Sequence, residues 1–92
     1  MTVEWDDEIK AFVSKKTGRL VAPRLDEDGI DLFFVENRND REARARYCSG
    51  EGYWAFPFSK EEIEKVLKDY EDIIEVIKKT PEKEILKLLG GD

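Results

Sequence analysis

The chain has 92 residues, of which 41% are charged and 40% hydrophobic, and its formal net charge is −6. This length predicts one domain over residues 1–92, large enough for a hydrophobic core but small enough to leave one face of a sheet uncovered. The longest uncharged stretch, residues 52–59, is far too short to cross a membrane. One cysteine and no histidine exclude an intramolecular disulfide and the usual metal clusters.

The first residues, MTVEWDDE, are acidic where a secretory signal would be basic and then apolar. We therefore expect a cytoplasmic protein without a membrane partner. Glutamine is also absent, whereas glutamate, lysine and isoleucine are abundant, a composition that fits a thermophilic source.

The first predicted element is a short amphipathic helix that begins near Asp6. Acidic residues lie in its first turn, Lys15 and Lys16 lie in its last turn, and Gly18 follows its end. One side of this helix carries Trp5, Ile9, Phe12 and Val13. A strand that begins at Lys10 is the alternative for the same segment.

Four strands are predicted after this helix. Residues 19–25 and 30–36 flank a turn with the sequence DEDG. Because Pro23 cannot donate a ladder hydrogen bond, we expect the first of these strands to lie at an edge or to bulge there. Residues 41–58 alternate on a two-residue period around the turn Ser49 to Gly52, which predicts a hairpin.

The turns also predict the strand register. Cys48 should lie opposite Tyr53, Tyr47 opposite Trp54, and Ala45 opposite Phe56; further registers pair Leu25 with Ile30, Arg24 with Asp31, Ala22 with Phe33, Phe33 with Arg46 and Val35 with Arg44. The face beneath the helices then collects Val21, Leu25, Ile30, Leu32, Phe34, Tyr47, Trp54, Phe56 and Phe58. The opposite face collects Leu20, Ala22, Arg24, Phe33, Val35, Arg44, Arg46, Tyr53 and Ala55. A slip of one residue would exchange the two sets.

Ser59 and Glu62 form a capping-box pattern that predicts the start of a long helix over residues 60–79. Thr80 and Pro81 predict its end and the start of a short helix that continues to Leu89, with Thr80 as the cap and Pro81 in the first helical position. The predicted fold is therefore an α+β domain in two layers: an N-terminal helix, a four-stranded antiparallel meander, a long helix and a short C-terminal helix.

The predicted outer face gives the sharpest functional hypothesis. It interleaves two aromatic residues, Phe33 and Tyr53, with Arg24, Arg44 and Arg46. Unpaired bases stack on aromatic rings at about 1–3 kcal/mol each, and basic side chains neutralise the phosphate backbone. We therefore expect binding of single-stranded DNA, or RNA, by these five residues. The alternatives are that the same apolar residues form a sheet-to-sheet dimer interface or lie beneath a loop.

The order of elements over residues 5–89 resembles two families of single-strand binders. A sheet followed by a long helix is similar to the transcriptional coactivators called positive cofactor four. A helix, four strands and terminal helices are similar to the archaeal ThermoDBP-type single-stranded DNA-binding proteins. The resemblance implies a dimer that binds through aromatic and basic residues of a sheet or cleft, and it transfers no individual residue. The acidic balance departs from a typical nucleic-acid binder.

That balance supports a second hypothesis, an acidic protein-interaction module such as an inhibitor or small subunit, which uses the same sheet face or the helices. An enzyme, a cofactor and a metal site are not expected, because the carboxylates near Asp26, Glu61 and Glu82 have no partnering base or nucleophile. Cys48 is expected to be a small strand residue; the alternative is a thiol whose pKa is lowered by nearby arginines.

The short C-terminal helix predicts a homodimer. It contains four apolar residues within five positions, and Leu86 points well away from the side shared by Ile85, Leu88 and Leu89. An isolated helix of this length is marginal, so a second chain would stabilise it. The alternative is that the helix simply caps the core of its own domain.

Overall fold

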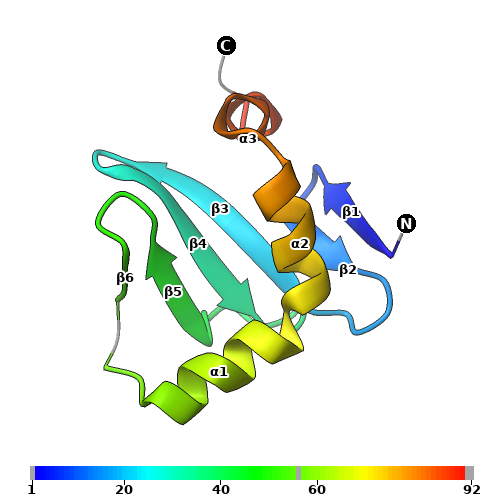
Figure 1. Cartoon of the computed structure of the whole chain (residues 1–92). Helices are drawn as coiled ribbons and strands as arrows, with labels where there is room; N and C mark the ends of the chain where they lie inside the picture. Colours follow the sequence, from blue (N-terminus) through cyan, green and yellow to red (C-terminus); the bar gives the residue numbers. More distant parts are fainter. Residues whose placement is uncertain (1, 56, 91–92) are drawn as a thin grey trace.

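The computed structural model describes residues 2–55 and 57–90. The chain forms a six-stranded antiparallel sheet whose strands follow the chain order, and three helices come after the sheet (Figure 1). The strands are β1 (Val3–Asp6), β2 (Ala11–Ser14), β3 (Leu20–Asp26), β4 (Gly29–Val35), β5 (Ala45–Cys48) and β6 (Tyr53–Trp54). The helices are α1 (Lys60–Asp69), α2 (Glu71–Lys79) and α3 (Glu82–Leu88).

A β-hairpin replaces the predicted N-terminal helix, so that prediction is wrong and the meander has six strands instead of four. The carboxylate of Asp6 accepts hydrogen bonds from the backbone amides two and three residues further on, at 3.0 and 3.3 Å. Lys10 completes the turn with a φ of 53°. Trp5 then pairs with Phe12 across the hairpin, with ring centroids 4.9 Å apart. The seven-residue spacing suits two helical turns as well as this cross-strand pair, which is why the pattern was ambiguous.

The predicted register of the later strands is largely confirmed. The β3–β4, β4–β5 and β5–β6 ladders contain the expected pairs Leu25–Ile30, Arg24–Asp31, Ala22–Phe33, Phe33–Arg46, Tyr47–Trp54 and Cys48–Tyr53. The β4–β5 ladder ends at Phe34 opposite Ala45, so the predicted pairing of Val35 with Arg44 does not form. The predicted pairing of Ala45 with Phe56 lies outside the described residues.

Pro23 lies in β3, which has a neighbour on each side, yet β2 pairs with β3 only at Leu20 and Val21. Pro23 therefore lies beyond the end of that ladder, where its missing N–H leaves no sheet hydrogen bond unmade. β3 is an interior strand whose second half is free on one side.

The main core lies between the sheet and the helices. Its buried members are Val3, Phe12, Val21, Phe34, Ala45, Val66, Tyr70 and Ile73, and Leu32, Tyr47, Trp54 and Phe58 pack against them. Most of the predicted core face is thereby confirmed. Leu25 is an exception, because its side chain is 63% exposed. Trp54 is only half-buried, although we expected it to be covered by the helix. Phe56 lies outside the described residues.

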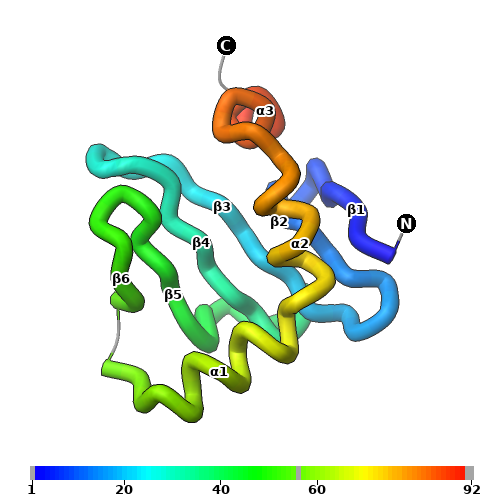
Figure 2. Tube along the Cα trace, in the orientation of Figure 1, coloured from blue at the N-terminus to red at the C-terminus, as the bar shows by residue number. Residues whose placement is uncertain are grey.

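The predicted long helix is two helices, α1 and α2, that meet at an angle (Figures 1 and 2). Tyr70 lies at the junction with φ −114° and ψ 17°, and its buried ring packs edge-on against Phe34 with centroids 5.3 Å apart. α2 packs on β1 and β2. The bend lets the chain bury Tyr70 while α1 and α2 follow different parts of the sheet.

The capping box of Ser59 and Glu62 forms as predicted. Thr80, in contrast, does not cap the last helix. Its hydroxyl donates to the carbonyl of Val76 at 2.7 Å, and Pro81 is the N-cap residue of α3. Over residues 2–55 and 57–90, no helix is long and apolar enough to cross a membrane.

Candidate nucleic-acid interface

The outer face of the sheet, opposite the helices, is partly covered. It carries a second apolar cluster with Ala11, Leu20, Ala22 and Val35 buried, and Ile9, Val13 and Phe33 packed against them. The segment 36–44 between β4 and β5 folds over this cluster toward the β1–β2 turn. Arg38 fixes that approach through ion pairs with Asp6 at 3.4 Å and Glu8 at 3.8 Å. The alternative that apolar residues of this face lie beneath a loop therefore holds for part of it.

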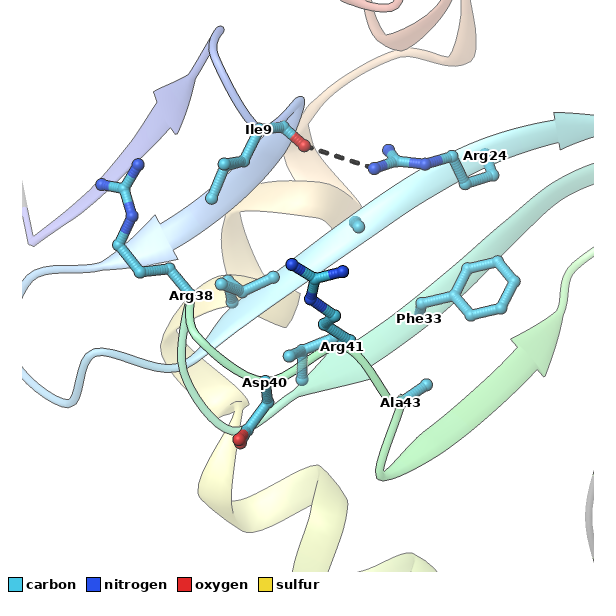
Figure 3. A pocket seen from close by; sticks show the side chains of 10 residues that line it. Ile9, Arg24, Phe33, Arg38, Asp40, Arg41 and Ala43 are labelled. Carbon is cyan, nitrogen blue, oxygen red and sulfur yellow. Dashed lines mark hydrogen bonds between the residues drawn. The ribbon is translucent and has the colours of Figure 1, made fainter.

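A groove remains between that segment, the β1–β2 turn and the sheet (Figure 3). Its volume is about 290 Å³, and we call it the outer groove. Its floor is formed by Leu20, Ala22, Phe33 and Val35. Its rim is formed by Ile9, Arg24, Arg38, Asp40, Arg41 and Ala43. The floor is thus apolar with one aromatic ring, and three of the four charged residues of the rim are arginines.

Arg24 reaches this rim from β3. Its guanidinium donates to the backbone carbonyls of Lys10 at 2.8 Å, Pro23 at 2.7 Å and Ile9 at 3.2 Å. These bonds anchor the β1–β2 turn where β2 and β3 diverge. No carboxylate of the described chain pairs with Arg24, so its positive charge is not neutralised by an ion pair.

Arg41 lies on the opposite rim, within the covering segment of residues 36–44. It is exposed, and it makes no ion pair with any described residue. Asp40 beside it accepts a hydrogen bond from the amide of Asn37 at 3.2 Å, which holds the covering segment in its turn. Arg24 and Arg41 are therefore the two cations of the outer groove without a carboxylate partner.

Phe33 and Arg46, both predicted site residues, contact each other on the outer face. The Arg46 guanidinium lies 5.1 Å from the ring centroid of Phe33. Arg46 also hydrogen-bonds the buried carboxylate of Asp31, with an Nε–Oδ2 distance of 3.1 Å, and approaches Asp26 at 3.6 Å. The hydrogen bonds from Arg46 lower the pKa of Asp31. The guanidinium of Arg46 is thus already paired with carboxylates of the chain, and it supports the ring of Phe33.

Tyr53 lies on the same face but in an acidic setting. It is 50% exposed and lines a separate pocket together with Asp26, Asp28, Asp31, Arg46, Cys48 and Glu51. A hydrogen bond with Glu51 raises the pKa of Tyr53.

Burial, together with the charge of Asp31, raises the pKa of the Cys48 thiol, so the alternative of an activated thiol is not supported. No group of acidic and cysteine side chains within the described ranges is arranged to hold a metal ion.

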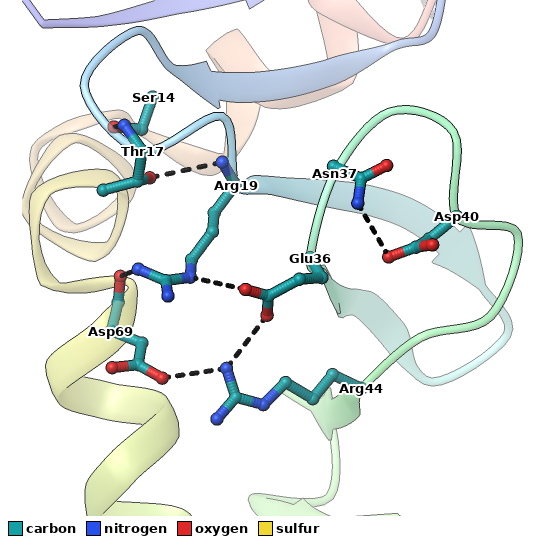
Figure 4. Close-up of polar contacts among 8 residues, drawn as sticks. All are labelled: Ser14, Thr17, Arg19, Glu36, Asn37, Asp40, Arg44 and Asp69. Atoms are coloured by element: carbon teal, nitrogen blue, oxygen red, sulfur yellow. Dashed lines mark hydrogen bonds and ion pairs between the residues drawn. The ribbon is translucent and has the colours of Figure 1, made fainter.

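Arg44 does not lie on the outer face, so this predicted position is wrong. Figure 4 shows it turned toward α1, where it pairs with Asp69 at 2.8 Å and with Glu36 at 3.1 Å. Arg19 joins the same cluster through Glu36 at 3.2 Å. Burial opposes the charge of Asp69, but its bonds with Arg44 and the charge of Arg19 prevail and lower the pKa of Asp69. The alternation of side chains along a strand does not predict where Arg44 points, because β5 begins only at Ala45.

The structure therefore divides the predicted site. Arg24 and Phe33 line the outer groove, the guanidinium of Arg46 lies over the ring of Phe33, Tyr53 lies in the acidic pocket, and Arg44 belongs to the interface with α1. Sequence reasoning missed Arg38 and Arg41. The clustering of all six arginines within residues 19–46 was a signal for them, but a loop has no register that would place them on a face.

The outer groove combines an apolar floor, one aromatic ring and two guanidinium groups that have no carboxylate partner among the described residues. Such a site can hold a planar group on the ring and an anion at the rim. No family model, curated protein or solved structure matches this chain. The fold alone places the protein in the α+β class, with an antiparallel meander followed by three C-terminal helices. The resemblance to single-strand binders assumed an N-terminal helix and four strands. The chain instead begins with a β-hairpin and has six strands, so its order of elements differs from the assumed one.

Proposed function

We propose that this protein binds short segments of single-stranded nucleic acid, most favourably DNA, in the outer groove. One observation carries the proposal: Arg24 and Arg41, without carboxylate partners in the described chain, flank the groove whose floor contains the half-buried ring of Phe33. A base stacked on Phe33 would leave its phosphates within reach of the two guanidinium groups. Stacking and charge neutralisation together are the usual basis of single-strand binding.

The surrounding charges limit the length of this contact. The acidic pocket next to Phe33 is lined by Asp26, Asp28 and Glu51, which repel a phosphate backbone. A strand that enters the groove therefore meets repulsion as it continues toward Tyr53. We infer that each protein molecule contacts only a few nucleotides. Tyr53 is therefore not part of the proposed site.

Titration of labelled oligothymidylates tests the proposal. Strands of about 4 to 16 nucleotides cover the site sizes of known single-strand domains. Two neutralised phosphates predict a slope of log affinity against log salt near about −1.4, because each phosphate contributes about −0.7. Affinity should then fall roughly seven-fold between about 50 and 200 mM salt. Absence of binding at the lower salt concentration, or equal binding of duplex DNA, would reject the proposal.

A protein-interaction module is the second candidate function, and one observation favours it. Two of the three arginines that were predicted to meet phosphate, Arg44 and Arg46, are already paired with carboxylates of the chain. With a net charge of −6, the remaining surface suits a basic protein better than a long polyanion. Salt-insensitive or absent oligonucleotide binding would favour this candidate.

A further inference from the structure

A second hollow lies on the other face of the sheet, the face that the helices partly cover. It opens between β4–β6 and the junction of α1 with α2, and its volume is about 400 Å³. We call it the apolar cleft; its lining is formed by Leu32, Phe34, Tyr47, Trp54, Leu67, Ile74, Ile77 and Lys78. It shares no lining residue with the outer groove, so a ligand here would be independent of the proposed nucleic-acid site.

The bend at Tyr70 explains why this cleft stays open. α2 packs on β1 and β2, which lie at the far side of the sheet from β6 (Figure 1). Leu32, Tyr47 and Trp54, one side chain from each of β4, β5 and β6, are therefore only partly buried, whereas Phe34 is buried against Tyr70. Trp54 is consequently only half-buried, and Leu67 of α1 is 43% exposed at the cleft.

The floor of the cleft is aromatic and well supported. Tyr47 and Trp54 pack edge-to-face across the β5–β6 hairpin with centroids 5.4 Å apart, and Phe34 lies 5.5 Å from Trp54. Phe34 itself is 2% exposed and anchors the group in the core. A floor of interlocked rings presents a preformed apolar surface, as small-molecule sites commonly do.

Lys78 supplies the charge of the cleft and is the one charged residue in its lining. It forms no ion pair with a described side chain. The adjacent Lys79, in contrast, reaches Glu75 at 4.0 Å. The apolar stem of a lysine can lie along a hydrophobic wall while its ammonium group stays near water. The cleft is therefore complementary to an apolar molecule with one negative charge at its end.

We propose that the apolar cleft binds a small amphipathic carboxylate, with its aromatic or acyl part against Trp54 and its carboxylate at Lys78. The volume lies near the lower end of the range for ligand sites, about 300–1,000 Å³. This size is sufficient for one ring system or a short acyl chain. The ligand class follows from the apolar walls and the single cation.

The experiment uses octanoate as the ligand and anilinonaphthalene sulfonate as a fluorescent reporter. The full chain carries Trp5→Phe, so that Trp54 is the single tryptophan. We expect a saturable reporter signal with one site per chain, energy transfer from Trp54, and displacement by octanoate. Octylammonium, which has the same chain and the opposite charge, should displace the reporter at least five-fold less effectively.

Three variants locate the site. Lys78→Gln should weaken octanoate binding about two- to five-fold, the range of a partly exposed ion pair. The matched control Lys79→Gln should bind as the parent chain does. Leu67→Glu places a negative charge at the exposed edge of the cleft and should lower octanoate affinity at least ten-fold without loss of oligonucleotide binding.

Several results would overturn the inference. These are the absence of a saturable reporter signal, equal displacement by octylammonium and octanoate, or equal effects of Lys78→Gln and Lys79→Gln. A dimer at micromolar concentration that Leu67→Glu dissociates would show that a second copy occupies the cleft instead. Loss of oligonucleotide binding in the Leu67→Glu variant, with a folded chain, would contradict the independence of the two sites.

Discussion

The guanidinium of Arg46 lies over the ring of Phe33, 5.1 Å from its centroid, and this contact joins β5 to β4 on the outer face. The same guanidinium is hydrogen-bonded to the buried carboxylate of Asp31. The carboxylate therefore holds Arg46, and Arg46 in turn supports the ring. A residue expected to meet phosphate has instead become part of the support for the aromatic ring that would meet a base.

Arg41→Gln should weaken single-strand binding without changing the stability of the fold. Arg41 is exposed and has no ion pair with a described residue, so its removal deletes charge from the groove and little else. The slope of log affinity against log salt should become less negative by about 0.7. Fluorescence anisotropy of a labelled oligothymidylate measures both quantities. Lys16→Gln, an exposed lysine outside the groove, is the control; equal losses in the two variants would indicate general electrostatics only.

Phe33→Leu should weaken oligonucleotide binding, because leucine keeps much of the apolar floor but lacks the stacking face. Base–aromatic stacking contributes about 1–3 kcal/mol, which corresponds to roughly a 5- to 150-fold loss of affinity. Tyr53→Ala should leave the affinity unchanged, since Tyr53 lies in the acidic pocket. Circular dichroism checks that both variants fold. The proposed base position would be refuted by normal binding of a folded Phe33→Leu chain.

Asp31→Asn should lower the free energy of unfolding by about 1.5–3 kcal/mol at neutral pH, the usual range for hydrogen bonds to a charged group. Hydrogen bonds from Arg46 lower the pKa of Asp31 in the folded state below its unfolded value. The stabilisation is therefore present above the unfolded pKa, about 3.9, and is lost as the pH falls through the folded pKa. Urea titrations from neutral to acid pH should show the difference between parent and variant shrinking below about pH 4. A difference that grows toward acid would mean that the carboxylate is not the stabilising form.

Gly50→Ala should destabilise the chain because two turns touch at this glycine. A Cβ atom at residue 50 would lie 1.6 Å from the carbonyl oxygen of Asp28, far inside van der Waals contact. The β3–β4 and β5–β6 turns must then move apart, at a cost of at least about 1–3 kcal/mol as in other overpacked sites. Thermal or urea unfolding measures the loss, with Glu51→Ala in the same turn as the control. An unchanged unfolding midpoint would show that the turns do not touch in solution.

We propose a homodimer through the C-terminal end, and Leu86→Lys should dissociate it. Leu86 and Leu89 of the α3 region line a pocket with Leu25, whose side chain is 63% exposed. Ile85 is buried in the domain, so a point variant tests the surface better than removal of α3. Sedimentation at micromolar concentration should show a dimer for the parent chain and a monomer for the variant. If the parent chain and the Leu86→Lys variant are both monomers, α3 does not mediate self-association.

The sequence alone predicted the features that depend on neighbouring residues. The turn residues Asp26 to Gly29 and Ser49 to Gly52 were sufficient for two hairpin registers, because a short loop leaves few ways to align the strands it joins. The alternation of side chains then assigned most core residues to the correct face. The capping box at Ser59 was equally local, since both hydrogen bonds lie within four residues.

The tertiary structure decided what local pattern leaves open. The spacing of Trp5 and Phe12 suits a helix and a hairpin alike. In the folded chain, Phe12 pairs with Val21, and the Ser14 hydroxyl donates to the carboxylate of Asp72 in α2 at 2.5 Å. Both contacts accompany the hairpin. Such contacts join residues up to 58 positions apart, so no window of the sequence displays them. Arg44 likewise turned toward Asp69 because that carboxylate is brought beside it only when α1 packs. Periodicity fixes which way a strand residue points, whereas the partner of a loop arginine depends on which distant groups the folded chain brings within reach.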